Sequence, residues 1–127
     1  MKAPKVEFEN FTFEESRYRR GSNIWYATTL MRAVKEQKLE PFDYPLAAAN
    51  LSILGFKVEN NDDFCWHVKR VLNADYSKPI IIDDHGEIAD GYHRIIHAII
   101  DGKAIIKAYR LKYMPPVDCN EQNNEDR

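Results

Sequence analysis

Residues 79–94 constrain the fold of this chain more than any other segment does. An apolar run, Ile80-Ile81-Ile82, is followed by Asp84-His85-Gly86 and by residues 87–89. Because β-branched residues favour strands, and Asp and Gly favour tight turns, this order predicts a strand, a hairpin turn and a return strand. The cluster Asp90-Gly91-Tyr92-His93-Arg94 then predicts the start of a helix, where unpaired N–H groups attract anions.

Hydrophobic periodicity and capping signals predict three helices. We expect the first to begin at Ser22 or Asn23 and to run to Gln37. We expect the second to begin within residues 61–63 and to end near Asp75, with one buried face formed by Phe64, Val68, Val71 and Leu72. The third runs from Tyr92 to Asp101, with Ile95, Ile96, Ile99 and Ile100 facing inward and Gly102 at the C′ position.

Alternation of apolar and polar residues predicts further strands. One contains Val6, Phe8, Phe11 and Phe13, and another covers residues 103–111. Phe42, Tyr44 and Leu46 predict a strand that Pro45 confines to a sheet edge. Residues 16–21 are polar and basic and predict a loop or short turn, and residues 51–58 support no assignment.

These elements predict an α+β fold, in which a small mixed sheet packs against helices. The length of the chain suits one domain, which we place at residues 1–117. Residues 118–127 are polar and acidic, and we expect them to form a disordered tail.

The overall charge does not by itself point to a nucleic-acid partner. The 127 residues carry a formal net charge of −2, whereas a strongly basic chain would indicate nucleic-acid binding. One local basic cluster, Arg17-Tyr18-Arg19-Arg20, has two open interpretations. It is either a solvated face, which we favour, or a contact for nucleic-acid phosphates and a stacked base.

Cysteine usage and hydropathy predict a cytoplasmic protein. Cys65 and Cys119 form neither a CxxC pair nor a disulfide framework, which indicates a reducing compartment. Residues 1–9 lack the apolar segment of a signal peptide, and no apolar run has the length that crosses a bilayer. We therefore expect no membrane partner.

The cluster at residues 90–94 suits phosphate chemistry. Gly91 lets a backbone approach a phosphate closely, and the N–H groups from Tyr92 onward point at its oxygens. Arg94 supplies a planar fork of donors and a permanent charge. His93 donates to a phosphate oxygen or moves a proton, and Asp90 holds Mg²⁺ or accepts a proton from a hydroxyl nucleophile.

A structural interpretation of the same cluster stays open. Asp-Gly is a common turn, so Asp90 is alternatively a helix cap and Arg94 alternatively a partner in a surface ion pair. His93 and His97 have the spacing of metal ligands on one helix face, but no third ligand is evident, and we do not favour zinc. Glu87, on the return strand, is either a catalytic base or, more commonly for such a residue, a solvated carboxylate.

Residues 62–111 resemble the ParB/sulfiredoxin superfamily. The resemblance rests on Asp63-Phe64, His67-Val68, the strand 79–83, the turn 84–86 and the motif Asp90-Gly91-Tyr92-His93-Arg94. Members hold nucleotide phosphates at this helix start, so the resemblance implies a bound nucleotide (ATP, ADP or CTP) with Mg²⁺. The preceding helix packs beside the nucleotide in that superfamily, which implies that His67 or Lys69 reaches a phosphate. For His67, a partly buried structural histidine is the interpretation that we favour.

Departures from the superfamily's motifs narrow the function that the resemblance implies. Sulfiredoxin requires a cysteine where this chain has Tyr92, and ParB motifs usually carry Glu-Arg-Arg in place of Tyr92-His93-Arg94. The motif is most similar to the Asp-Gly-x-His-Arg motif of a free serine kinase. We therefore expect a nucleotide- or phosphate-binding domain that acts as a phosphotransferase or nucleotide hydrolase. A DNA-associated ParB-like or nuclease-like module and a non-catalytic interaction protein are the alternatives.

Overall fold

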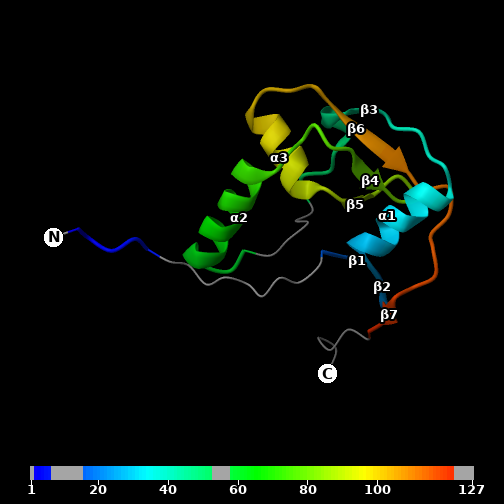
Figure 1. Cartoon of the computed structure of the whole chain (residues 1–127), viewed down its shortest axis with the longest axis horizontal. Helices are drawn as coiled ribbons and strands as arrows, with labels where there is room; N and C mark the ends of the chain where they lie inside the picture. The colour runs from blue at the N-terminus through cyan, green and yellow to red at the C-terminus, as the bar shows by residue number, and fades with distance from the viewer. Residues whose placement is uncertain (1, 7–15, 53–57, 122–127) are drawn as a thin grey trace.

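A computed structural model describes residues 2–6, 16–52 and 58–121 of the chain (Figure 1). These residues form three α-helices, one 3-10 helix and seven strands in two small sheets, which confirms the α+β class. In chain order the elements are β1 (Arg17–Arg20), β2 (Asn23–Tyr26), α1 (Ala27–Glu36), β3 (Phe42–Pro45), the 3-10 helix η1 (Leu46–Ala48), α2 (Asn61–Asn73), β4 (Ile80–Ile82), β5 (Ile88–Asp90), α3 (Tyr92–Ile100), β6 (Ile105–Arg110) and β7 (Cys119–Asn120). None of the described helices has the length and hydrophobicity to span a membrane.

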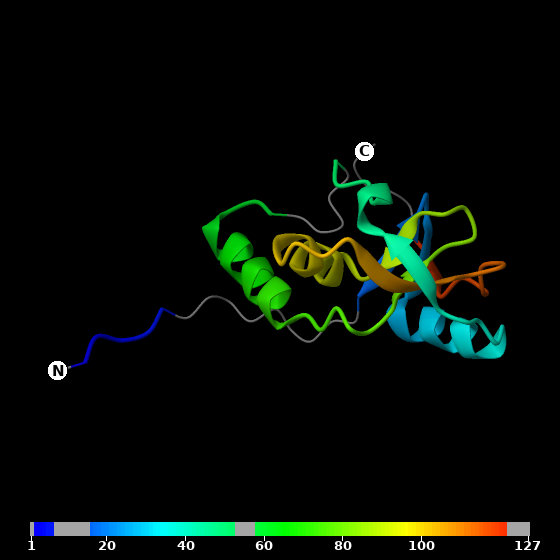
Figure 2. The same ribbon diagram turned by 90° about the horizontal axis from the view of Figure 1, so that it is seen from above.

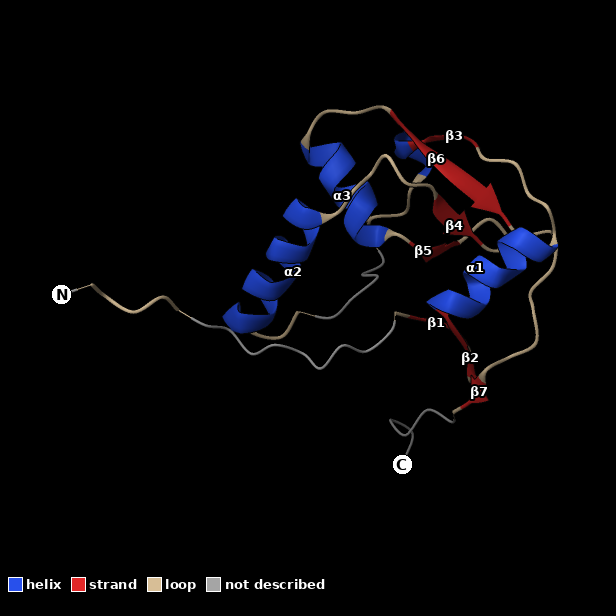
Figure 3. Ribbon diagram, viewed as in Figure 1, coloured by secondary structure: helices blue, strands red, loops and turns tan. Residues whose placement is uncertain are grey.

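The four-stranded sheet, in the order β3-β6-β4-β5, forms the centre of the molecule. β4 runs parallel to β6 and antiparallel to β5, so the sheet is mixed, as expected. Successive strand residues point to opposite faces, and the buried side chains of β4 accordingly divide between two apolar clusters. Ile80 and Ile82 pack with Ile95 and other residues of one cluster, whereas Ile81 packs with Leu30 and the rest of the other. α3 and α1 therefore cover opposite faces of the sheet (Figure 3).

The second sheet, in the order β1-β2-β7, is joined to the first through Asp83. This buried carboxylate accepts hydrogen bonds from Tyr18 Oη and from the Arg20 guanidinium, both at 2.6 Å. Its other oxygen accepts from the backbone N–H groups of His85 and Glu87. One side chain thus fixes the turn between β4 and β5 and ties that turn to β1.

The prediction for residues 16–26 was wrong in two respects. Residues 17–20 form strand β1 rather than a loop, and residues 23–26 form β2 rather than the first turn of a helix. The alternation in β1 was obscured because its inward-facing positions carry Tyr18 and Arg20, which are not aliphatic.

Helix α1 begins later than predicted because residues 23–26 are paired as strand β2, and a carboxylate from the far end of the chain contacts its start. The carboxylate of Asp118 accepts hydrogen bonds from the Tyr26 N–H at 2.8 Å and from Thr29 Oγ1 at 2.9 Å. Residues 119–120 pair with β2 as strand β7, so the expectation of a disordered tail from residue 118 was wrong for these residues. Residues 122–127 lie outside the described part of the chain.

Helix α2 has the predicted position but not the predicted buried face. The side chain of Asn60 accepts from the Asp63 N–H and caps the helix, as local signals at residues 61–63 indicated. However, Phe64 and Leu72 are 57% and 60% exposed, and Val71 is the buried residue of the helix. α2 lies beside α3 and apart from the sheets in two views (Figures 1 and 2), and among the described elements α3 is its main packing partner.

The remaining elements match the predictions more closely. β3 is an edge strand, although Leu46 begins η1 instead of continuing it, and β6 buries Ile106 and Ala108 on its inward side. α3 ends at Ile100, with Gly102 at a φ of +77°, but Ile100 itself is exposed. Of the strand predicted around residues 6–13, Val6 lies in no strand, and the other positions fall outside the described residues.

Candidate functional site

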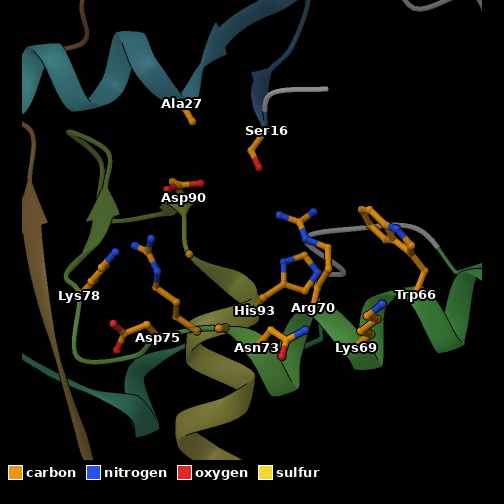
Figure 4. Close-up of a pocket in the computed structure, with 13 residues that line it drawn as sticks. Ser16, Ala27, Trp66, Lys69, Arg70, Asn73, Asp75, Lys78, Asp90 and His93 are labelled. Carbon is orange, nitrogen blue, oxygen red and sulfur yellow. The ribbon is translucent and has the colours of Figure 1, made fainter. Parts of the chain in front are cut away.

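A cleft of about 580 Å³ lies between α2, the first turn of α3 and the start of α1 (Figure 4). Its charged lining residues are the cations Lys69, Arg70, Lys78 and Arg94 and the carboxylates Asp75 and Asp90. Gly91 and His93 also line it, so the structure brings most of the predicted motif to one cavity. Positive charge predominates among these residues, and the N–H groups at the start of α3 add to it.

Gly91 has a packing role that accounts for its identity. Its φ of +117° is one that residues with a side chain rarely adopt, and a Cβ built on it would lie 2.4 Å from Cγ2 of Ile80. The glycine therefore allows the junction between β5 and α3 to pack against β4. It makes space for Ile80 as well as lining the cleft.

Arg94 connects the start of α3 to the loop before β4. Its Nη1 donates to the Pro79 carbonyl at 3.0 Å. Because guanidinium carries five N–H donors, this bond leaves the side chain able to contact a ligand in the cleft that it lines. Arg94 is thus both a structural donor and a cation of the cleft, rather than one half of a simple surface ion pair.

His93 is paired with His67 from α2. His67 Nδ1 lies 3.0 Å from His93 Nε2, and the two rings are stacked with their centroids 5.2 Å apart. Burial, with smaller contributions from Arg70 and His67, lowers the pKa of His93 to about 4. His93 is therefore neutral at pH 7. His67 contacts His93 from α2 and is not among the residues that line the cleft.

Asp90 lies at the end of β5 and faces the cleft (Figure 4). Burial raises its pKa, and the nearby charges of Arg94 and Arg70 partly offset that effect. The N-cap of α3 is Gly91, and no described side chain forms a capping hydrogen bond there, so the interpretation of Asp90 as a helix cap was wrong. A carboxyl group with a raised pKa beside arginines is suited to proton transfer.

The described residues do not build a metal site around Asp90. No group of three or more His, Cys, Asp or Glu side chains among them has the geometry to hold a metal ion. His97, four residues after His93, lies with Nδ1 2.9 Å from the Ala74 carbonyl oxygen and Nε2 3.4 Å from the Asp101 carboxylate. Because Mg²⁺ is usually held by one or two carboxylates together with the phosphates of a ligand, the assignment of Asp90 to Mg²⁺ stays a prediction.

Besides His67, two predicted site residues do not line the cleft. The side chain of Tyr92 packs against the cluster that contains Tyr44, although its backbone begins α3. Burial is the main cause of the raised pKa of Tyr92 and of Tyr44, and the charge of the nearby Glu87 carboxylate adds to it. Neither Tyr92 nor Glu87 lines the cleft, whereas Lys69, predicted as an accessory residue, does.

Arg70 and Lys78 were not predicted as site residues. Arg70 lies over the ring of Trp66, with its Cζ 4.9 Å from the ring centroid, and both side chains line the cleft (Figure 4). Trp66 and Arg70 are four residues apart, so their side chains lie on the same face of the helix, and this spacing could have indicated that the two belong to one site. It was missed because residues 64–72 were interpreted through their apolar stripe. Lys78 is brought to the cleft by the loop before β4, which no local pattern specifies.

A second cavity of about 940 Å³ adjoins the cleft along α1. It shares Arg70, Lys78, Asp90 and Arg94 with the cleft and adds Arg32 and Lys35 as further cations. Met31, Pro79 and Tyr109 give this part a more apolar lining. The two cavities together form a groove with its polar end at α3 and room for a ligand larger than a phosphate.

The basic cluster at residues 17–20 is engaged in contacts within the protein. Arg20 pairs with Asp83 and Asp84, and Arg19 lies 3.6 Å from the Glu121 carboxylate. Arg17 lies over the ring of Tyr26. These contacts support a structural role for the cluster.

Comparisons with family models, with curated proteins and with solved structures found no significant match for this chain. The resemblance to the ParB/sulfiredoxin superfamily therefore stays a prediction that rests on the residues of the motif.

Proposed function

We propose that this protein binds a phosphorylated ligand in the cleft, with a nucleotide such as ATP, ADP or CTP as the ligand class that the motif suggests. The observation that carries the proposal is the convergence of Lys69, Arg70, Lys78 and Arg94 on the first turn of α3, opposed by two carboxylates. Arginine and lysine together with helix N–H groups are the usual donors to phosphate.

The shape of the groove supports a ligand with a phosphorylated end and a larger body. The end near Arg70 and Arg94 is the more polar one, whereas the adjoining cavity offers Met31, Pro79 and Tyr109. Such a ligand places its phosphate oxygens against the cations and its remaining surface along α1. Inorganic phosphate alone would leave most of the groove unfilled.

Asp90 and His93 give the cleft groups for phosphoryl transfer or nucleotide hydrolysis. Asp90 accepts the proton of an attacking hydroxyl or water, a role for which its raised pKa is favourable. His93, neutral at pH 7, offers its ring for a hydrogen bond to the ligand. The cations neutralise charge on the transferred group, the main electrostatic requirement of this reaction.

Calorimetric titration with ATP, ADP, CTP and pyrophosphate, each with and without Mg²⁺, tests the proposal. We expect Arg70→Gln and Lys78→Gln each to weaken binding about tenfold, because each removes one charge from the cleft. Lys103→Gln is the matched control, since Lys103 is an exposed cation just beyond the C-terminal end of α3. Arg94→Ala is less informative because it also removes the bond to Pro79.

Equal affinities for Arg70→Gln, Lys78→Gln, the control Lys103→Gln and the wild type would contradict the proposed site. Binding of DNA at low salt, with no response to any nucleotide, would favour the DNA-associated alternative. Failure to bind either class of ligand would favour an interaction protein without a phosphate site.

A further inference from the structure

His67 and His93 form a close pair of imidazoles at the edge of the cleft. Their facing nitrogens are 3.0 Å apart, and the ring planes differ by 11°. His93 lines the cleft, while His67 stands behind it on α2. The pair therefore connects the ligand-facing ring to a second titratable ring.

Two facing ring nitrogens at hydrogen-bond distance require one proton between them. When both rings are neutral, one donates that proton and the other accepts it. When one ring is protonated, it still donates to its neutral partner, so the hydrogen bond persists. Two protonated rings would place N–H donors against each other, which is unfavourable. The pair thus accommodates one additional proton and titrates as a unit.

The charges around the pair oppose that additional proton. Among the residues that line the cleft, Arg70 and Lys69 come from α2, Lys78 from the loop before β4, and Arg94 from α3, whereas Asp90 on β5 and Asp75 on the loop before β4 are the opposing acids. Burial together with Arg70 and His67 keeps the pKa of His93 low. A dianion placed among these cations offsets their repulsion and makes protonation of the pair more favourable.

We propose that His67 and His93 share a proton as one unit, and that binding of a dianionic group in the cleft draws a proton from solution onto this pair. The proposal rests on the proposed function of the cleft and assigns its regulation by pH. By linkage, affinity for an anion rises as the pH falls, by at most about tenfold per pH unit for one proton. His67 is then a positioning residue that acts through His93.

Inorganic sulfate is the suitable probe because it stays a dianion between about pH 5.5 and pH 8, so that a proton taken up on binding goes to the protein and not to the ligand. Calorimetry in buffers of different ionisation enthalpy measures the protons taken up on binding. We expect the wild type to take up a proton, with an uptake that approaches about one per sulfate. In His67→Gln the amide can keep a hydrogen bond to His93 but cannot titrate, so sulfate still binds with less proton uptake and a flatter pH dependence.

The double variant His67→Gln/His93→Gln should bind sulfate without this uptake, and Lys103→Gln should behave as the wild type does.

Imidazole ¹⁵N NMR of the unmodified protein provides a measurement that needs no variant. Added sulfate should move the titration of both rings together to higher pH. Sulfate binding without proton uptake, or without a shift of both rings, would overturn the proton-sharing pair and leave the anion site intact. If sulfate does not bind, the proposal of a proton-sharing pair is also overturned. The nucleotide titrations then show whether the cleft binds phosphorylated ligands at all.

Discussion

Gly91 shows how one residue serves both the fold and the candidate site. Its positive φ turns the chain from β5 into α3, and its missing side chain leaves room for Ile80. The same turn presents Asp90 and His93 to the cleft from either side of the glycine. Burial then drives both groups toward their uncharged forms, because it raises the pKa of Asp90 and lowers that of His93. Opposite shifts in one cleft are typical of functional sites.

We expect Gly91→Ala to lower the free energy of unfolding by about 2–4 kcal/mol, since a methyl group meets Ile80 and a positive φ is strained for alanine. Gly21→Ala is the matched control, because Gly21 has a φ of +61° and a methyl group added there would meet no described neighbour within 4 Å. Its expected loss is about 1 kcal/mol, from backbone strain alone. Urea unfolding measures both, and equal losses would contradict the packing role of Gly91.

Helix α2 contributes more to the cleft than to the core. Trp66, Lys69 and Arg70 line the cleft from this helix, and His67 supports His93. In contrast, Phe64, Val68 and Leu72 form an exposed apolar stripe beside a shallow surface cavity. The helix is held at its own start by Asn60 and against the domain by Val71.

Two neighbouring substitutions in α2 separate the buried residue from the exposed stripe. We expect Val71→Ala to lower the free energy of unfolding by about 2 kcal/mol, because Val71 is 5% exposed. Leu72→Ala should change it by no more than about 0.5 kcal/mol, although it removes a larger side chain. Denaturant unfolding of the two variants checks the order, and a larger loss for Leu72→Ala would show that this stripe is covered in solution.

At the scale of the whole molecule, Asp83 joins the two sheets. Burial by itself would raise its pKa, but hydrogen bonds from Tyr18, Arg20 and two backbone N–H groups hold the pKa below its ordinary value. A carboxyl group whose pKa is depressed on folding stabilises the protein above its unfolded pKa. That contribution is lost as the pH falls through the lower, folded value.

We expect Asp83→Asn to lower the free energy of unfolding by about 3 kcal/mol at pH 7, because the amide keeps one acceptor oxygen and turns its NH2 group toward N–H or O–H donors at a buried position, although Arg20 keeps its ion pair with Asp84. The difference from the wild type should shrink as the pH falls below about 4, the ordinary carboxyl pKa of the unfolded chain, toward the lower pKa of folded Asp83. Asp43→Asn, which removes an exposed ion pair with Lys107, should cost less than about 1 kcal/mol. Urea unfolding at pH 7 and pH 3 tests this expectation, which fails if the Asp83 difference is independent of pH.

Local sequence determined those elements whose start, end and burial depend on near neighbours. The three isoleucines of β4 are buried, α2 begins at Asn61, and Gly102 follows the end of α3, as their patterns indicated. The capping side chain of α2 is that of Asn60, one residue before the predicted start signals. The motif at residues 90–94 likewise predicted that Asp90, Gly91, His93 and Arg94 reach one cavity. In each case the controlling interactions span only a few residues, so the local sequence pattern is enough to predict the element.

Tertiary structure alone decided what depends on contacts between distant segments. Asp118 contacts the start of α1 across 92 residues from Tyr26. Pairing with β2 makes residues 17–20 a strand, and Asp83 accepts hydrogen bonds from Tyr18 and Arg20 of that strand. The packing of α2 beside α3 pairs His67 with His93 and turns Arg70 into a cleft residue. Local periodicity cannot show these outcomes, because a side chain's burial and charge partners depend on which element lies beside it after folding.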